Sequence, residues 1–255
     1  MKYHSFREEF AVKPDVKPNL LKYLILGAGG LGLFLQRMLY STGIDGKGLL
    51  ICGHWAQTGL LILTGLVIAA VFWGTRGLQA SKALAPEPSV PGGIGCLLGA
   101  AALFLRLPEP LMGPDRLYLL EQYFSLIARL LLCILASCRF SGKKPHFLLR
   151  GILCLYLAVR MVAQYRLRSS DPQLMDYALF LLAHVALVLS TYQMAALDGG
   201  FGNLKKLWFW GLIALYLCCC APCDRENRIF LLLLGLWLFT SLPAFQPEAD
   251  SGDTP

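Results

Sequence analysis

Charged side chains are scarce in this sequence. Asp, Glu, Lys and Arg make up 15% of its 255 residues and hydrophobic residues make up 56%, whereas an ordinary soluble domain carries roughly 25% charged residues. A chain this apolar buries too much surface to stay disordered. It also has few charges with which to cover the surface of a soluble protein. The composition therefore favours a protein that lies in a lipid bilayer.

Several signatures of known chemistry are also missing. The sequence has no Walker A lysine loop, no H-E-x-x-H helix, no G-x-S-x-G elbow and no pair of acids at a useful spacing. Its net charge is +7, but the basic residues are spread over the connections between apolar stretches, so no nucleic-acid partner is expected. Nine cysteines are too sparse for a disulfide-stapled secreted domain. No cofactor or metal is expected.

Long apolar stretches fill most of the chain. A helix needs about 17 to 25 residues to cross roughly 30 Å of hydrocarbon. Eight stretches approach that length: 20–40, 55–73, 90–107, 117–138, 147–161, 175–197, 204–221 and 229–245. Three of them, 90–107, 204–221 and 229–245, have short uncharged stretches of a kind that can also be re-entrant or interfacial, which leaves six or seven crossings as alternatives. The expected fold is all-α, a polytopic transmembrane helix bundle of about eight spans.

The ends of the chain are polar. Residues 1–19 form a basic segment, residues 20–242 the transmembrane domain, and residues 243–255 an acidic, flexible tail. No A-x-A-like cleavage site follows the first apolar stretch, so this stretch is expected to remain as an anchor. With eight spans, more Lys and Arg residues fall on the side of the N-terminus than on the other side. The positive-inside rule then predicts a plasma-membrane protein with both termini in the cytoplasm.

A faint internal repeat runs through the chain. The first and fifth stretches both end in an Arg-Met pair, Arg37-Met38 and Arg160-Met161, and a polar segment and a strongly apolar stretch follow each pair. Two tandem four-helix halves, 20–138 and 147–242, would have the same orientation because four crossings separate them. Some transporters are built from parallel repeats of this kind.

A glycine-rich motif, GAGGLG at residues 27–32, lies in the first apolar stretch. It is similar to the nucleotide-binding loop of the ubiquitin-activating-like adenylyltransferases, in which glycines let backbone amides approach a phosphate. That family has an acidic residue at the end of the following strand, whereas this chain has Cys52-Gly53-His54 there. The favoured alternative is helix packing, since Ala28 and Gly32 would let a neighbouring backbone approach closely.

Four cysteines stand together at the end of the seventh stretch: Cys218, Cys219, Cys220 and Cys223. Cys220 and Cys223 form a C-x-x-C pair, which supplies a nucleophile and a resolving thiol in thiol–disulfide exchange. With eight spans this segment faces outward, where oxidising conditions prevail. The alternative is that these cysteines pack as small apolar residues. A soft-metal site is not expected, because no histidine lies nearby in the sequence.

Ionisable residues gather around the fifth and sixth stretches. The candidates for a solute or ion pathway are Arg160, Asp171, Asp176 and His184. Ionisable groups in or beside a span are costly and tend to face a cavity or a partner. Asp176 and His184 are eight residues apart, about 80° around a helix, so they share a side. The alternative is a solvated loop, with His184 bonded across helices as structural glue.

The fourth stretch also contains two charged residues, Glu121 and Arg129. Charged residues within a span either serve a pathway or stabilise the packing between helices. The sequence leaves both interpretations open for this pair.

Two polar segments resemble those of multi-pass integral membrane proteins of bacteria: the run RSSDPQLMDY at residues 168–177 and the loop IDGKG at residues 44–48. The resemblance implies a membrane location and carries no activity and no site residue.

Three functions are compatible with these patterns. The first is a small-solute transporter or transport-accessory subunit that uses the polar residues of the fifth and sixth stretches. The second is an envelope thiol–disulfide oxidoreductase that uses the C-x-x-C pair. The third is a non-catalytic scaffold or sensory subunit whose membrane or cytoplasmic partner binds the basic N-terminal segment. The sequence does not specify an oligomeric state.

Overall fold

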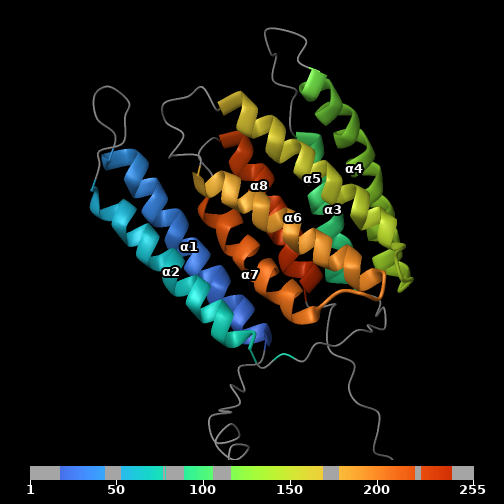
Figure 1. Cartoon of the computed structure of the whole chain (residues 1–255), viewed down its shortest axis with the longest axis horizontal. Coiled ribbons are helices and arrows are strands. Elements are labelled where there is room, and N and C mark those ends of the chain that lie inside the picture. The colour runs from blue at the N-terminus through green and yellow to red at the C-terminus, as the bar shows by residue number, and fades with distance from the viewer. Residues whose placement is uncertain are drawn as a thin grey trace, which may run out of the picture.

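The computed structural model describes residues 18–43, 53–76, 78, 89–105, 116–168, 178–221 and 225–242 (Figure 1). These residues form helices and short connections, with no strand among them. The helices are α1 (Pro18–Thr42), α2 (Trp55–Gly74), α3 (Val90–Leu105), α4 (Arg116–Ser141), α5 (Phe147–Arg168), α6 (Ala178–Asp198), α7 (Leu204–Cys220) and α8 (Arg225–Ser241). Each helix falls on one of the eight apolar stretches, so the prediction of an all-helical bundle is confirmed.

The helices differ in length. Among the described residues, α1, α2, α4, α5 and α6 are long and apolar enough to cross a membrane. The other three, α3, α7 and α8, have 16, 17 and 17 residues, and they match the three stretches for which fewer crossings were an alternative. Large apolar side chains are exposed on the outer faces, among them Leu61, Leu66 and Phe104. This surface is compatible with insertion into a membrane.

Helices that follow one another in the chain run antiparallel, so their starts alternate between the two ends of the bundle. Lys22, near the start of α1, lies against Phe239, near the end of α8. The start of α3 meets the end of α4, where the Ser89 amide donates to the Arg139 carbonyl at 3.1 Å. The beginning of α1 and the end of α8 therefore lie at the same end of the bundle, as an even number of crossings requires.

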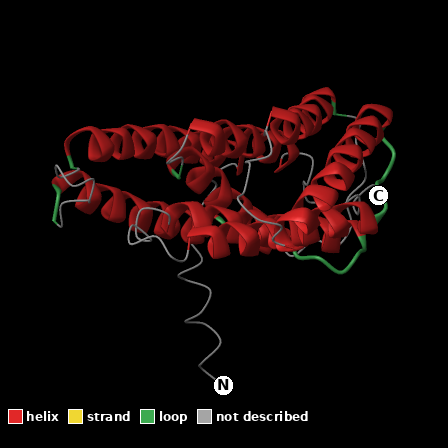
Figure 2. Cartoon of the chain, turned by 90° about the horizontal axis from the view of Figure 1, so that it is seen from above, coloured by secondary structure: helices red, strands yellow, loops and turns green. Residues whose placement is uncertain are grey.

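Six helices form a closed ring. In order of contact, α3 packs against α4, α4 against α5, α5 against α6, α6 against α7, α7 against α8, and α8 again against α3. Seen from above, the helices lie in two rows (Figure 2). The seam between α8 and α3 uses small residues: a Cβ on Gly99 would lie 3.5 Å from the Cβ of Trp237, and Gly95 faces Thr240. Such a Gly-x-x-x-Gly face lets two helix backbones approach closely.

The hairpin of α1 and α2 lies outside this ring and packs against α7 (Figure 1). Gly29 and Gly32 of α1 face Cys219 and Cys220 of α7. The interpretation of the glycine-rich motif as a packing face is therefore correct, but the pair in contact is Gly29 and Gly32, three residues apart. The predicted partner of Gly32, Ala28, is only partly buried, although it packs against the core.

The contacts join the two predicted tandem halves instead of separating them. Helix α3 of the first half packs against α8 of the second, and α1 packs against α7. The helices thus group by packing as a hairpin of two and a ring of six. The internal repeat is a similarity between two sequence segments, and the packing contacts do not test it. It stays a prediction.

A glycine pair in α1 provides a test of the α1–α7 contact. A Cβ on Gly29 would lie 2.8 Å from the Cβ of Cys219, which cannot move without moving the backbone, whereas a Cβ on Gly30 meets nothing within 4 Å. We expect Gly29→Ala to lower the free energy of unfolding by about 1–3 kcal/mol through overpacking. Gly30→Ala should leave it unchanged or raise it by up to about 1 kcal/mol. Denaturation of the purified protein in mild detergent measures both; equal stability of the two variants would contradict the contact.

The alternation of helix ends predicts how the protein is labelled in membrane vesicles. Ser41, at the end of α1, and Lys143, between α4 and α5, are exposed at opposite ends of the bundle. With the unsubstituted protein as background, an impermeant maleimide should label Ser41→Cys and Lys143→Cys from opposite sides of a sealed membrane. Phe201→Cys, between α6 and α7, should be labelled from the same side as Lys143→Cys. Labelling of all three from one side would contradict the arrangement.

Candidate functional site

Arg160 lies fully buried in α5, with 0% of its surface exposed. It projects from one wall of the six-helix ring toward side chains of three other helices: Glu121 of α4, His184 of α6 and Phe230 of α8. The same helix carries Tyr156 one turn earlier, on the same face. Because these residues come from helices around the ring, the Arg160 cluster, defined as these five residues, occupies the ring's interior.

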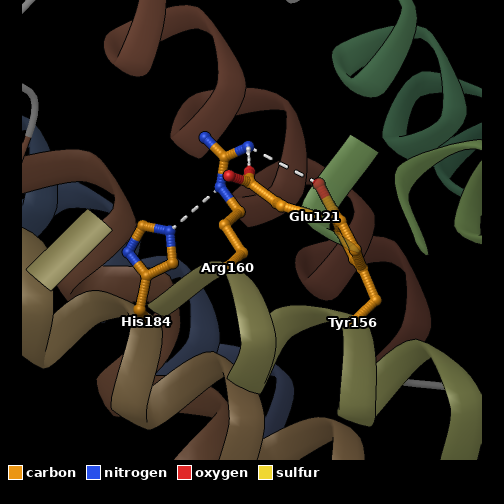
Figure 3. Close-up of polar contacts among 4 residues, drawn as sticks. All are labelled: Glu121, Tyr156, Arg160 and His184. Carbon is orange, nitrogen blue, oxygen red and sulfur yellow. Dashed lines mark hydrogen bonds and ion pairs between the residues drawn. The ribbon is translucent and has the colours of Figure 1, made fainter. Parts of the chain in front are cut away.

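The guanidinium of Arg160 has a different polar partner on each side (Figure 3). Its Nη1 donates to Oε1 of Glu121 and to the hydroxyl of Tyr156, both at 3.5 Å. Its Nε donates to Nε2 of His184 at 3.4 Å. All of these distances lie beyond the usual 2.7–2.9 Å of a charge-assisted hydrogen bond. The guanidinium thus lies between an acid and a histidine.

The contacts of His184 define which ring nitrogen carries the proton. Its Nδ1 lies 2.9 Å from the carbonyl oxygen of Phe180, and a carbonyl only accepts, so Nδ1 is the donor. Its Nε2 faces the N–H of Arg160 and therefore acts as an acceptor. A histidine that donates through one nitrogen and accepts through the other is neutral. The Arg160 cluster then holds one positive group, Arg160, and one negative group, Glu121.

Aromatic rings cover the charged groups. The ring of Phe230 lies 3.6 Å from the guanidinium carbon of Arg160, a cation–π contact. His184 stacks on the same ring with centroids 6.3 Å apart, and Phe180 lies 4.4 Å from the imidazole. Phe180 and Phe230 are both buried. These rings keep the local dielectric low, so each polar contact in the cluster matters more than it would in water.

Gln164 adds an unused polar group next to the cluster. It lies one turn after Arg160 on α5 and is 3% exposed, and its Oε1 has no hydrogen-bond partner among the described residues. Residues four apart lie on the same helix face. A buried amide oxygen without a partner is costly, and in native proteins it indicates a water or a ligand. The side of the cluster toward the end of α5 therefore presents a buried polar atom.

The structure brings together two of the four predicted pathway residues. Arg160 and His184 are in direct contact, whereas Asp171 and Asp176 lie outside the described residues. Glu121, left open between packing and function, is the acidic partner of Arg160. Tyr156 was not predicted, although its position one turn before Arg160 was a signal in the sequence. Gln164 was not among the predicted pathway residues.

Arg129, the other charged residue of α4, lies apart from the Arg160 cluster. Its guanidinium carbon sits 4.9 Å from the ring of Phe104 on α3, and its side chain is partly exposed. It therefore provides a cation of similar depth that does not take part in the cluster.

A second ionic group lies at the opposite end of the bundle. Arg150, near the start of α5, forms a direct ion pair with Asp198, at the end of α6. Both side chains are buried, and Arg139 lies close by in α4. The pair joins two helix ends beside short connections, at 142–146 and 199–203. This placement fits a structural clamp between α5 and α6.

The glycine-rich motif does not form a phosphate loop. Residues 27–32 lie in the middle of α1, which runs without a break from Pro18 to Thr42. Their backbone amides are used inside the helix, so none is left to cradle a phosphate. The nucleotide-binding alternative is therefore wrong, and its physical reason is that a continuous helix replaces the expected strand and turn.

The cysteines of α7 lie in the same contact. The Cys220 thiol is buried and donates to the carbonyl of Gly29 at 3.7 Å, and Cys218 is also buried. Buried thiols among apolar groups are usually inert, because the reactive thiolate needs solvation or a nearby positive charge. These contacts fit a packing role for Cys220. Its predicted redox partner, Cys223, lies outside the described residues.

Among the described residues, no group of three or more His, Cys, Asp and Glu side chains is placed to hold a metal ion. Comparison with known proteins found no matching family model, no matching curated protein and no matching solved structure.

The ion pair at the opposite end yields a stability prediction. Asp198→Ala would leave the buried guanidinium of Arg150 without its acid, so we expect the free energy of unfolding to fall by about 3–5 kcal/mol. The double variant Arg150→Met, Asp198→Leu removes both charges and should recover most of that loss. Titration with SDS from mild-detergent micelles measures the effect, with the exposed Lys143→Gln as a neutral control. A double variant less stable than Asp198→Ala would contradict the clamp.

Proposed function

We propose that this protein is a transporter, or the solute-binding subunit of a transporter, for a small anionic solute, and that Arg160 is the group that binds the anion. The observation that supports this most directly is the placement of Arg160, a fully buried cation inside a ring of six apolar helices, in contact with an acid and a histidine. Helices arranged around an interior charge are the usual setting of a solute site in a membrane protein.

The energetics argue that such a residue is kept for a reason. Transferring an arginine into the middle of a membrane-spanning helix costs about 2.5–3.5 kcal/mol by insertion scales. A buried ion pair returns that cost only when its geometry is close and its other polar atoms are satisfied. The contacts of Arg160 lie at 3.4–3.5 Å, and the amide oxygen of Gln164 beside it is unpaired among the described residues. The cost of burying this cation therefore supports a role beyond helix packing.

The competing explanation is that the cluster holds helices together. The chain already has a close ion pair for that purpose, Arg150 with Asp198, at the end where the connections are short. The Arg160 cluster lies at the other end of the bundle, among buried aromatic rings and beside the buried amide oxygen of Gln164. These differences favour solute binding over a purely structural role.

We further propose that the bundle lies in a plasma membrane with both chain termini in the cytoplasm. The end of the bundle that contains the start of α1 and the end of α8 also carries basic side chains. Lys143 and Lys144 are exposed between α4 and α5, and Lys205 and Lys206 stand at the start of α7. An excess of Lys and Arg on one side supports its cytoplasmic placement. The Arg160 cluster would then lie toward the outer side.

Uptake into proteoliposomes tests the proposed function. The probes are radiolabelled acetate, lactate, succinate and inorganic phosphate, each measured by exchange at equal concentrations inside and outside. We expect the unsubstituted protein to exchange at least one of these anions and Arg160→Gln to reduce the rate at least tenfold. The loss follows because the glutamine lacks the positive charge that offsets the solute.

Arg129→Gln provides the matched control, since it removes a cation from the neighbouring helix without touching the Arg160 cluster. It should keep most of the activity. Size-exclusion chromatography in detergent and the charge-preserving Arg160→Lys separate loss of binding from loss of fold. Full exchange by a folded Arg160→Gln, or no exchange of any probe by the unsubstituted protein, would refute the proposal.

A further inference from the structure

We infer that Gln164 selects the solute, and that the site takes a small carboxylate with a hydroxyl group on the carbon next to the carboxyl group. The inference rests on the proposed function, in which Arg160 binds the anionic group, and it adds the class of solute and a specificity-determining residue. It starts from the amide of Gln164, which is 3% exposed and whose Oε1 has no hydrogen-bond partner among the described residues.

Gln164 belongs to the face of α5 that turns into the ring. The buried residues of this helix recur every three or four positions, at Leu153, Tyr156, Arg160 and Gln164. Tyr156 lies one turn before Arg160, and Gln164 lies one turn after it. The Cβ atoms of residues four apart on a helix are separated by about 5–6 Å. A solute of a few heavy atoms can therefore contact both Arg160 and Gln164.

The amide oxygen of Gln164 cannot be satisfied in the way that buried hydroxyls are. Ser190 and Thr191 are also buried, and their hydroxyls donate to the carbonyl of Leu187 in their own helix, at 3.0 and 2.8 Å. An amide oxygen only accepts, and the N–H groups within a helix are already used by its backbone. Because a buried acceptor without a donor is costly, the oxygen of Gln164 calls for a donor from a water or a solute.

Arg160 and Gln164 require opposite groups on the solute. A guanidinium has only N–H donors and binds an anionic oxygen, whereas the amide oxygen binds an O–H or N–H donor. A solute that satisfies both carries a carboxylate and a donor a short distance apart. A hydroxyl suits this position better than an ammonium group, because Gln164 is neutral and the guanidinium one turn away repels a second cation.

The order of residues along α5 also suits Gln164 to selection. The helix ends at Arg168, one turn after Gln164, and Tyr165 and Arg166 are exposed. A solute that enters from this end of the bundle meets Gln164 before Arg160. When no solute is bound, water can donate to the amide oxygen, and displacing that water lowers affinity unless the solute reproduces the hydrogen bond. The amide therefore disfavours carboxylates that lack a hydroxyl.

Three probes that differ in one substituent test the inference. Lactate has a hydroxyl next to its carboxylate, propionate has a hydrogen there, and alanine has an ammonium group. Isothermal titration calorimetry of the purified protein in mild-detergent micelles at pH 7.5 measures the dissociation constant of each, with both enantiomers of lactate and alanine. No bilayer separates two compartments, so permeation of neutral acids does not contribute. We expect the preferred enantiomer of lactate to bind at least tenfold more tightly than propionate or alanine.

Gln164→Met removes the acceptor oxygen and keeps an unbranched side chain of similar length. We expect it to weaken lactate at least tenfold and to leave propionate unchanged, so that the preference for lactate disappears. A disturbed fold would weaken both ligands alike. Gln193→Met removes the amide of a partly exposed glutamine near the far end of α6, and it should keep the preference. The three probes on the unsubstituted protein stay decisive if Gln164→Met does not fold.

The outcomes distinguish this inference from the proposed function. Equal binding of lactate and propionate, each weakened at least tenfold by Arg160→Gln, would overturn the role of Gln164 and leave the anion site standing. Tighter binding of alanine than of lactate would overturn the assignment of a hydroxyl. A preference for lactate that persists in Gln164→Met would place the hydroxyl against another group. No binding of lactate would overturn the inference, and absence of exchange for every anion in the proteoliposome panel would overturn the proposed function itself.

Discussion

The burial of one cation, Arg160, is the constraint on which the interior of this bundle depends. A guanidinium in an apolar interior must be neutralised and must use its donors, so α4, α6 and α8 each bring a partner to it: Glu121, His184 and Phe230. These partners fix how the helices are rotated about their own axes at this end of the ring.

The two ionic groups divide the bundle into ends of different character. At one end, Arg150 and Asp198 meet directly beside short connections, with α3, α4, α5 and α6 closely joined. At the other end, Arg160 is held by several longer contacts beneath aromatic rings. The two ends of the bundle are therefore held by different kinds of contact.

Much of the fold could be predicted from the sequence, because hydropathy is a local property. Each of the eight apolar stretches coincides with one of the eight helices of the described residues, and the three stretches with an alternative to crossing, 90–107, 204–221 and 229–245, coincide with the three shortest helices. The candidate site was only partly predictable. Arg160 and His184 stood out as charged or polar residues within spans, but the choice of Glu121 as partner depends on how α4 packs against α5. Likewise, the contact with α7 is made by Gly29 and Gly32, whereas the sequence predicted Ala28 and Gly32. Which of these residues faces α7 depends on the rotation of α1 about its own axis.

The order of contacts in the ring also bears on how the protein assembles. From α4 to α8, each helix packs against the one synthesised immediately before it, so most contacts form between neighbours as the chain emerges. Two contacts must wait: the α1–α2 hairpin has no ring to join until α7 is made, and the seam of Gly95 and Gly99 closes only when α8 arrives. A chain that stops before α8 therefore leaves an open arc of helices, with the guanidinium of Arg160 lacking the ring of Phe230. Addition of the last helix thus closes the ring and covers its interior charge in one step.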